Sequence, residues 1–239
     1  MGDIPSPLLT NRFTDAIDFA LVAHCAQVRK GTRIPYLSHL LAVASLVIEH
    51  DGDEDAAIAA VLHDAPEDQG GRAMVEQIRA RFGDGVAAIV EACTDTFEKP
   101  KPEWPPRKTK YVEHLAAEAS LGACIVSAAD KLHNARAILH DLRASDDHPS
   151  FWARFGSPPR QIGWYYGRLE RALGARLAAH DGREMVMELT HTLDAIAAIP
   201  GCDAFGHGLK LGRSGNACPE ALLASKTGTD QSIAVGEQP

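Results

Sequence analysis

The chain has 239 residues, of which 45% are hydrophobic and 23% are charged, as is typical of a globular protein with one good-sized domain. Its formal net charge of −8 argues against binding to nucleic-acid polymers, which normally requires a basic face. No apolar stretch approaches the roughly 20 residues that span a bilayer, so we expect no membrane association.

The amino terminus lacks the charged-then-apolar pattern of a secretory signal, and the five cysteines form no closely spaced pairs. We therefore expect a cytoplasmic protein with reduced thiols, three of which would fill helix interfaces. Positive charge is local, at residues 29–33 and 107–110. Two such clusters suit a small polyanion better than a polymer, although residues 107–110 fit a solvated helix end equally well.

Apolar residues recur at helical spacing through most of the chain, so the sequence predicts an all-α helical bundle. Thr14 is the expected cap of the first helix, and Asp53 opens the third. In chain order, the predicted helices cover residues 14–30, 37–50, 53–63, 72–81, 84–95, 106–118, 121–143, 160–180 and 183–198.

From about Pro200 the composition changes, because the remaining residues are rich in Gly, Ser, Ala and Thr and show no sustained apolar period. Such a segment buries too little apolar surface to offset its ordering entropy. We predict one domain over residues 1–199 and a flexible C-terminal tail over residues 200–239. No pattern indicates an oligomeric state.

The dipeptide His63-Asp64 lies between His39 upstream and Asp130 downstream, and it is the most informative feature of the chain. An adjacent histidine and aspartate offer one nitrogen and one oxygen to a single divalent metal, and one ligand each from an earlier and a later helix would complete the site. Such a site leaves positions open for water, and a metal-bound water is a nucleophile near neutral pH. Asp130 follows an apolar segment, where a cation would offset the cost of burying a carboxylate.

Each of these residues also has an ordinary structural interpretation. His63 and Asp64 fit a histidine and a capping aspartate at a helix end, and His39 fits a hydrogen-bonded core histidine. Asp130 could pair with Arg136 or with Lys131, although the helical spacing fits poorly with Lys131. If a metal is bound, mixed nitrogen and oxygen ligands suit Mn²⁺, Fe²⁺ or Zn²⁺ better than Ca²⁺.

Four ordered blocks surround these residues. They are Arg29-Lys30-Gly31, Pro35-Tyr36-Leu37-Ser38-His39, Leu62-His63-Asp64-Ala65-Pro66-Glu67-Asp68 and Ala129-Asp130-Lys131-Leu132-His133-Asn134-Ala135-Arg136. Together they resemble the HD-type hydrolase domain of the RelA/SpoT family, which removes the 3′-pyrophosphate from the alarmone ppGpp. The likeness covers roughly residues 12 to 195 and is closest to small stand-alone alarmone hydrolases without a synthetase domain.

The resemblance implies an HD-domain helical bundle in which His39, His63, Asp64 and Asp130 hold Mn²⁺. It assigns Glu67 and Asp68 the role of general base or water-orienting group. Without it, this acidic pair would be interpreted as a solvated helix end. Pro66 departs from the family pattern, in which an aliphatic residue is typical. Because proline removes a helix hydrogen bond and biases Ala65 away from helical geometry, we expect the helix to break here.

The resemblance also implies a nucleotide pocket. Arg29 and Lys30 match the family's basic pair, which contacts the base and phosphates. Asn134 lies one turn beyond Asp130 and would hydrogen-bond a purine edge. Lys108 is the candidate for a pyrophosphate contact, and Tyr165 for a contact near the ribose or 3′-phosphate. An aromatic cluster such as residues 164–166 is also typical of a core, and we expect His24 to be structural or to support the site from behind.

Three functions follow from these patterns. The first is a metal-dependent pyrophosphohydrolase that converts ppGpp-like guanosine or adenosine alarmones to the parent nucleotide and pyrophosphate. The second keeps the metal chemistry on another nucleotide, as a nucleotidase, phosphodiesterase or NADPH phosphatase. The third is a nucleotide-binding regulator without turnover, which the presence of all four ligand positions and the acidic pair disfavours. The expected partner is a small nucleotide in each case.

Overall fold

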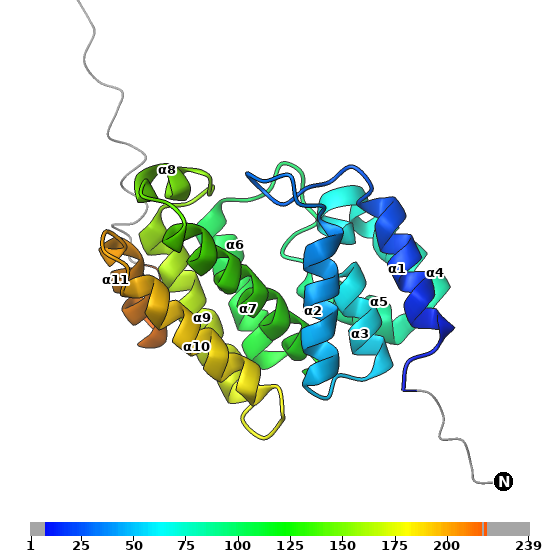
Figure 1. Cartoon of the computed structure of the whole chain (residues 1–239). Coiled ribbons are helices and arrows are strands. Elements are labelled where there is room, and N and C mark those ends of the chain that lie inside the picture. The colour runs from blue at the N-terminus through cyan, green and yellow to red at the C-terminus, as the bar shows by residue number, and fades with distance from the viewer. Residues whose placement is uncertain (1–7, 217, 219–239) are drawn as a thin grey trace, which may run out of the picture.

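The computed structural model describes residues 8–216 and residue 218, and the regular secondary structure in this part of the chain is helical throughout, as predicted (Figure 1). The elements are α1 (Asn11–Ala23), α2 (Leu37–Glu49), α3 (Glu54–Leu62), the π-helix η1 (Pro66–Gly70), α4 (Gly71–Phe82), α5 (Asp84–Cys93), α6 (Trp104–Ala117), α7 (Leu121–Arg143), α8 (His148–Ala153), α9 (Pro159–Arg176), α10 (Arg183–Ala197) and α11 (Asp203–Arg213). None of the described helices combines the length and hydropathy that crossing a bilayer requires.

Two buried helices, α3 and α7, form the centre of the bundle. Every residue from Ala56 to Leu62 is buried, so α3 is apolar on all sides. The long helix α7 packs against α2, α3 and α5 on one side and α9 and α10 on the other (Figure 1). Side chains at the end of α3 and in the middle of α7 are therefore held inside the protein, where their positions are restricted by packing.

The first helix differs from the prediction at both ends. It begins at Asn11, because the Thr10 hydroxyl accepts a hydrogen bond from the Arg12 amide at 3.2 Å and caps it. It ends at Ala23 instead of residue 30. Residues 24–36, which we call the α1–α2 loop, turn back on themselves: Tyr36 N donates to Gln27 O at 2.9 Å. The residues of this loop form hydrogen bonds with one another and with polar groups elsewhere, so the helix does not continue beyond Ala23.

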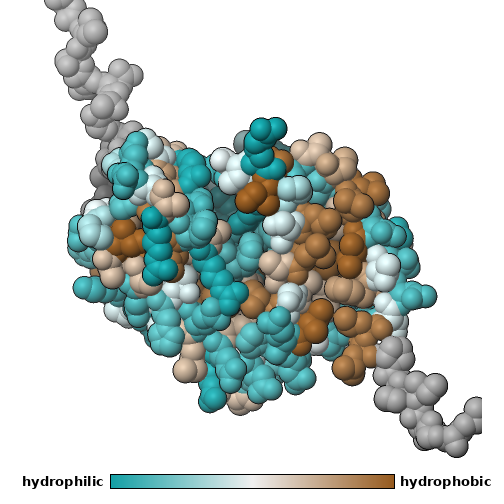
Figure 2. Space-filling view, in the orientation of Figure 1, coloured by the Kyte–Doolittle hydropathy of each residue, from teal (hydrophilic) through white to brown (hydrophobic). Residues whose placement is uncertain are grey.

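Most other predicted helices lie within a few residues of the observed ones, and the short helix α8 was not predicted. Exposed apolar residues are unevenly distributed over the surface of the bundle. Figure 2 shows a broad apolar area over the side that α1 and α2 form, where Leu21, Val22, Leu41 and Ile48 are exposed. The five cysteines are free, as expected.

The predicted tail over residues 200–239 is wrong for its first part, because Asp203–Arg213 form helix α11. This helix packs along α9 and also contacts α10, so the domain predicted over residues 1–199 extends through it. Its buried apolar residues are few, namely Phe205 and Leu209, and glycine is frequent. The composition therefore did not indicate a packed helix. Residue 217 and residues 219–239 of the predicted tail lie outside the described residues.

Glycines on both helices let α9 and α11 approach backbone to backbone. A Cβ atom on Gly163 of α9 would lie 2.1 Å from the carbonyl oxygen of Phe205, and one on Gly208 of α11 would lie 1.9 Å from that of Arg160. Neither distance is compatible with a side chain, and a backbone carbonyl cannot rotate away. The contact therefore requires glycine, and it replaces the apolar side chains that usually join two helices.

We expect Gly208→Ala to destabilise the protein by about 1–3 kcal/mol or more, because the added methyl group forces α11 away from α9. The free energy of unfolding, measured by denaturant titration, checks this. Gly174→Ala is the matched control on α9, since its Cβ would meet only Val186 Cγ1 at 3.7 Å. That change should be neutral or stabilise by up to about 1 kcal/mol. Equal effects of the two substitutions would contradict the close-packing explanation.

Candidate metal centre and substrate pocket

His39 lies in the first turn of α2 and is fully buried. Its Nδ1 atom is 2.8 Å from Nδ1 of His133, so one of these two nitrogens donates to the other. Burial, followed by the neighbouring His39 and Arg29, lowers the pKa of His133 to about 4, so this ring is neutral and can accept a hydrogen bond. With His133 as the acceptor, His39 carries its proton on Nδ1. Its Nε2 atom is left with a free lone pair that faces Asp130 Oδ1 at 3.2 Å.

His63 and Asp64 follow the last residue of α3, and both side chains turn toward the same point. His63 Nδ1 is 2.8 Å from the carbonyl oxygen of Ala60 and donates to it, so the lone pair of the ring is on Nε2. Asp64 Oδ2 is 3.1 Å from His63 Nε2 and 3.6 Å from His39 Nε2. The adjacent pair therefore presents one nitrogen and one oxygen to a shared position.

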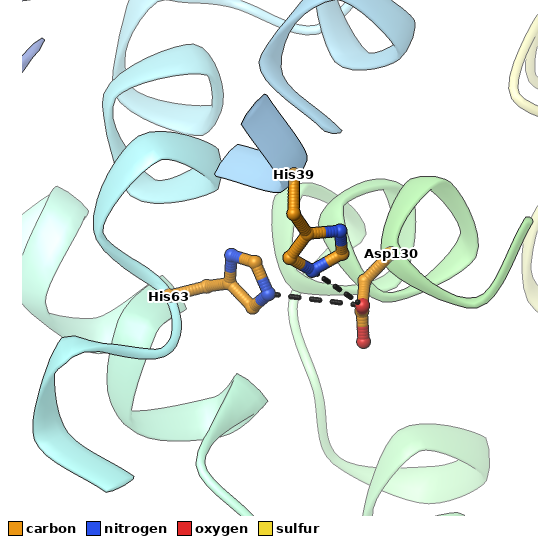
Figure 3. Close-up of side chains that lie close together, drawn as sticks. All are labelled: His39, His63 and Asp130. Carbon is orange, nitrogen blue, oxygen red and sulfur yellow. Dashed lines mark ion pairs between the residues drawn. The ribbon is translucent and has the colours of Figure 1, made fainter. Parts of the chain in front are cut away.

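Asp130 enters from the middle of α7, so the cluster draws on three helices (Figure 3). Its Oδ1 atom is 3.2 Å from His39 Nε2 and 3.8 Å from His63 Nε2. Its Oδ2 atom pairs with Lys131. The helical spacing had disfavoured this contact, but the lysine side chain is long enough to reach the carboxylate of its neighbour. Arg136, the other partner considered from sequence, pairs with Glu188 instead.

The donor set fits a divalent metal. The ligand atoms of His39, His63 and Asp130 lie within 4.8 Å of one another, and the buried Nε2 atoms of both histidines have no hydrogen-bond partner. Burial lowers the pKa of His63, but Asp64 and Asp130 outweigh it and raise that pKa well above its usual range. The cluster therefore favours an added positive charge, which a metal cation supplies without a proton.

Tyr36 supports this cluster and was given no role from the sequence. Its hydroxyl donates to Asp64 Oδ2 at 2.6 Å. Burial and the Asp64 carboxylate raise the pKa of Tyr36 far above its usual value, so the hydroxyl remains a donor. The ring of His24 stacks on Tyr36 at 5.3 Å, and His24 is buried, which agrees with its expected supporting position.

Glu67 and Asp68 lie in η1, directly after the His63-Asp64 pair. The predicted effect of Pro66 on Ala65 is wrong, because Ala65 keeps helical angles of φ −59° and ψ −41°. The α-helical pattern does end, and the chain continues as a π-helix, in which Gly71 N donates to Pro66 O. Packing of the buried Pro66 overrides the local bias of a residue before proline.

The two carboxylates of η1 have different partners. Glu67 accepts a hydrogen bond from Lys101 Nζ at 2.6 Å, whereas Asp68 accepts one from Gln27 Nε2 at 2.7 Å. Burial raises the pKa of Asp68, and the nearby Asp64 adds to this effect against the opposing hydrogen bond from Gln27. Asp68 thus lies within electrostatic reach of the candidate ligand Asp64, and Glu67 lies within reach of Lys108 in the cavity wall.

A cavity of about 550 Å³ borders the cluster, and its lining includes Tyr36, Lys131 and His133, each of which contacts a candidate metal ligand. The five residues predicted to bind substrate line this one cavity, namely Arg29, Lys30, Lys108, Asn134 and Tyr165. Apolar and aromatic residues complete the wall, including Ile138, Phe151, Phe155 and Ile162. A cavity of this kind suits a ligand with a flat apolar part and an anionic part.

Within the cavity, the cationic groups are held by neighbours. Arg29 Nη2 donates to Asn134 Oδ1 at 2.8 Å, which links the α1–α2 loop to α7. Lys108 Nζ donates to Asp95 Oδ2 at 2.8 Å and lies 5.0 Å from the centre of the Tyr165 ring. Burial, with the nearby Lys131 ammonium, lowers the pKa of Lys108 to about 7. Tyr165 is buried and its hydroxyl has no partner.

The chain is similar to several known proteins. A family model described as HD domain matches residues 16–156. Guanosine-3′,5′-bis(diphosphate) 3′-pyrophosphohydrolase MESH1 of Xenopus tropicalis is 40% identical over 125 residues, which are 51% of this chain and 66% of that protein. The human MESH1 is 38% identical over the same shares of the two chains. The alignment thus spans slightly less than two thirds of these relatives.

Two solved structures resemble the fold. One is described as a metazoan ortholog of SpoT that hydrolyses ppGpp and plays a role in starvation responses; it has a TM-score of 0.55 and 26% identity, and the match covers 82% of this chain and 98% of the other. The second, from Listeria monocytogenes, has a TM-score of 0.53 and 25% identity and covers 64% of this chain and 97% of the other. Together with the match over residues 16–156, these findings confirm the resemblance, and the chain belongs to the HD domain family.

Proposed function

We propose that this protein is a metal-dependent hydrolase that removes the 3′-pyrophosphate from ppGpp-type alarmones. The observation that carries the proposal is the cluster of His39, His63, Asp64 and Asp130 beside a cavity lined by cationic and aromatic side chains. The names of the relatives from Xenopus tropicalis and Homo sapiens, both guanosine-3′,5′-bis(diphosphate) 3′-pyrophosphohydrolases, support the choice of substrate.

The proposed cofactor is Mn²⁺. Imidazole nitrogens and carboxylate oxygens together suit Mn²⁺, Fe²⁺ or Zn²⁺, and the resemblance to the RelA/SpoT hydrolase domain favours Mn²⁺ among them. When bound, such a metal supplies Lewis-acid chemistry and lowers the pKa of a coordinated water toward neutrality. The lone pair on Nε2 of His63, fixed by the hydrogen bond from its Nδ1 atom to Ala60, and the unpartnered, buried Nε2 atom of His39 support this assignment. Lys131 would hold the second oxygen of Asp130 and keep its first oxygen directed at the metal.

The substrate would lie along the cavity with its 3′-pyrophosphate next to the metal centre. Lys108 would pair with the pyrophosphate, and Tyr165 would contact the ribose side. Arg29, Lys30 and Asn134 would hold the base and the remaining phosphates, since the guanidinium of Arg29 can stack on a purine and the amide of Asn134 can bond its edge. Glu67 and Asp68 would orient the attacking water and accept its proton.

In the proposed reaction, water attacks the phosphorus next to the ribose, and the bond between that phosphorus and the ribose 3′-oxygen breaks. The 3′-oxygen leaves with a proton, so the products are the 5′-diphosphate nucleotide and pyrophosphate. Lys131, which pairs with Asp130, and Lys108 both line the cavity, so their ammonium groups are available to pair with the anionic pyrophosphate.

The test is a nucleotide panel with purified, Mn²⁺-loaded protein, containing ppGpp, its adenine counterpart and NADPH. We expect GDP and pyrophosphate from ppGpp, detected by ³¹P NMR, and no turnover after dialysis against a chelator until Mn²⁺ is restored. Asp64→Ala should lower kcat by at least about a hundredfold, because the metal contributes several kcal/mol to the transition state. Release of single phosphate, tight ppGpp binding without turnover, or an undiminished Asp64→Ala enzyme would each contradict the proposal.

Tyr36→Phe should weaken Mn²⁺ binding by about tenfold or more, because it removes the hydrogen bond that orients Asp64. Titration calorimetry with the metal alone measures this. Tyr111→Phe is the matched control, since its buried hydroxyl bonds Ser127 Oγ at 2.9 Å and contacts no candidate ligand. If both variants bind Mn²⁺ as the wild type does, Tyr36 does not support the metal centre.

Lys108→Met should raise the KM for ppGpp by about tenfold or more, because a charge-assisted hydrogen bond of about 1.5–3 kcal/mol is lost.

The lowered pKa of Lys108, about 7, gives the direction in which the KM for ppGpp should change with pH. The ammonium is charged below that pH and loses its proton above it, so the wild-type KM should rise between about pH 6 and about pH 8. The same rise in Lys108→Met would contradict this role, and the exposed Lys110→Met serves as the control.

A further inference from the structure

Gln27, in the α1–α2 loop, contacts one of the two carboxylates that follow the metal-ligand pair. We infer that Gln27 is a positioning residue that fixes the side chain of Asp68 for its part in hydrolysis. The inference rests on the proposed function. Its observation is the hydrogen bond of 2.7 Å from Gln27 Nε2 to Asp68 Oδ2, between residues far apart in the sequence.

The orientation of the Gln27 amide is determined by its other partners. Its Oε1 atom accepts from Gln69 Nε2 at 2.7 Å and is 2.7 Å from Nδ1 of His24. A flipped amide would place its NH₂ group against the NH₂ of Gln69 and its oxygen against the Asp68 carboxylate, so it would lose these bonds and add repulsion. The NH₂ group of Gln27 therefore faces Asp68.

The backbone of Gln27 is fixed as well. Its amide donates to the carbonyl oxygen of His24 at 3.0 Å, and its own carbonyl accepts from Tyr36 N at 2.9 Å. Tyr36 in turn donates through its hydroxyl to Asp64 at 2.6 Å, and its ring stacks on His24. One short loop thus bonds both Asp64, a candidate metal ligand, and Asp68 of η1. It therefore fixes the spacing of these two carboxylates.

Asp68 needs such a partner because its own element does not restrain it. It lies in the π-helix η1 shortly before Gly70, and its side chain accepts its hydrogen bond from Gln27, outside that element. With Oδ2 bound to Gln27, its second oxygen is left as an acceptor for a water molecule. Glu67 differs, since it is paired with the Lys101 ammonium at 2.6 Å. The two carboxylates are therefore positioned separately, and loss of Gln27 should affect the position of Asp68 and leave that of Glu67 unchanged.

The experiment compares Gln27→Met, which keeps size and removes the amide, with the wild type in full-length, Mn²⁺-loaded protein. We expect kcat for ppGpp to fall by about tenfold or more, with KM and Mn²⁺ affinity within about twofold of the wild type. Gln77→Met, the same change at an exposed position of α4, is the control and should leave all three constants unchanged. A fall in melting temperature without a fall in kcat would indicate a structural role only and overturn the inference.

A double-mutant cycle with Asp68→Ala tests the coupling. In the Asp68→Ala background, Gln27→Met should cause little further loss of kcat, because its target is already absent. Equal losses in both backgrounds would overturn the inference. A crystal structure of Gln27→Met gives a second readout that does not depend on residual activity: an unchanged Asp68 side chain would also overturn it. Failure of the wild type to hydrolyse ppGpp would contradict the proposed function instead.

Discussion

The structure depends on bringing two carboxylates and two imidazoles together inside a helical bundle, where each group would be unfavourable alone. Asp130 shows this balance most clearly. Burial raises its pKa, but the neighbouring Lys131 ammonium opposes that effect, and the pKa of Asp130 lies well below the usual value. Asn134 Nδ2 also donates a hydrogen bond to Asp130 Oδ1. The bundle can bury this carboxylate only because opposite charge and hydrogen-bond donors are built in around it. The buried residues of α3 and α7 then fix the geometry, since these helices cannot shift without opening the core.

The α1–α2 loop performs a second task that the bundle cannot. Helices deliver the candidate metal ligands, but the groups that orient them and shape the pocket come from residues 24–36. Tyr36 bonds Asp64, Gln27 bonds Asp68, and Arg29 bonds Asn134. The same stretch closes on itself through its backbone, with the bridge between Val28 and Pro35. A loop that is anchored in this way can act as a rigid part of the site even though it is not helical.

Much of the fold and the candidate site could be predicted from the sequence, and the omissions have physical causes. Helical periodicity located α2 to α7 well, because each buries one apolar face or is buried entirely. His39, His63, Asp64 and Asp130 were grouped correctly through ordered motifs that resemble a known family. Gln27 and Tyr36 were missed because their partners lie 41 and 28 residues away, and no local pattern records a bond of that kind. Helix α11 was missed because its glycines indicate flexibility in isolation and close contact only beside α9.

The close contact between α9 and α11 has a consequence for the cavity. Helix α9 supplies Tyr165 and Tyr166 to the cavity wall, and the backbone of α11 lies directly against the other side of α9. Trp164, a buried residue of α9, donates its indole N–H to the carbonyl oxygen of Asn216. The last described part of the chain therefore supports the aromatic wall of the cavity, which other helices complete. A fragment that stopped at residue 199 would keep every candidate metal ligand and still lose the support that keeps this wall in place.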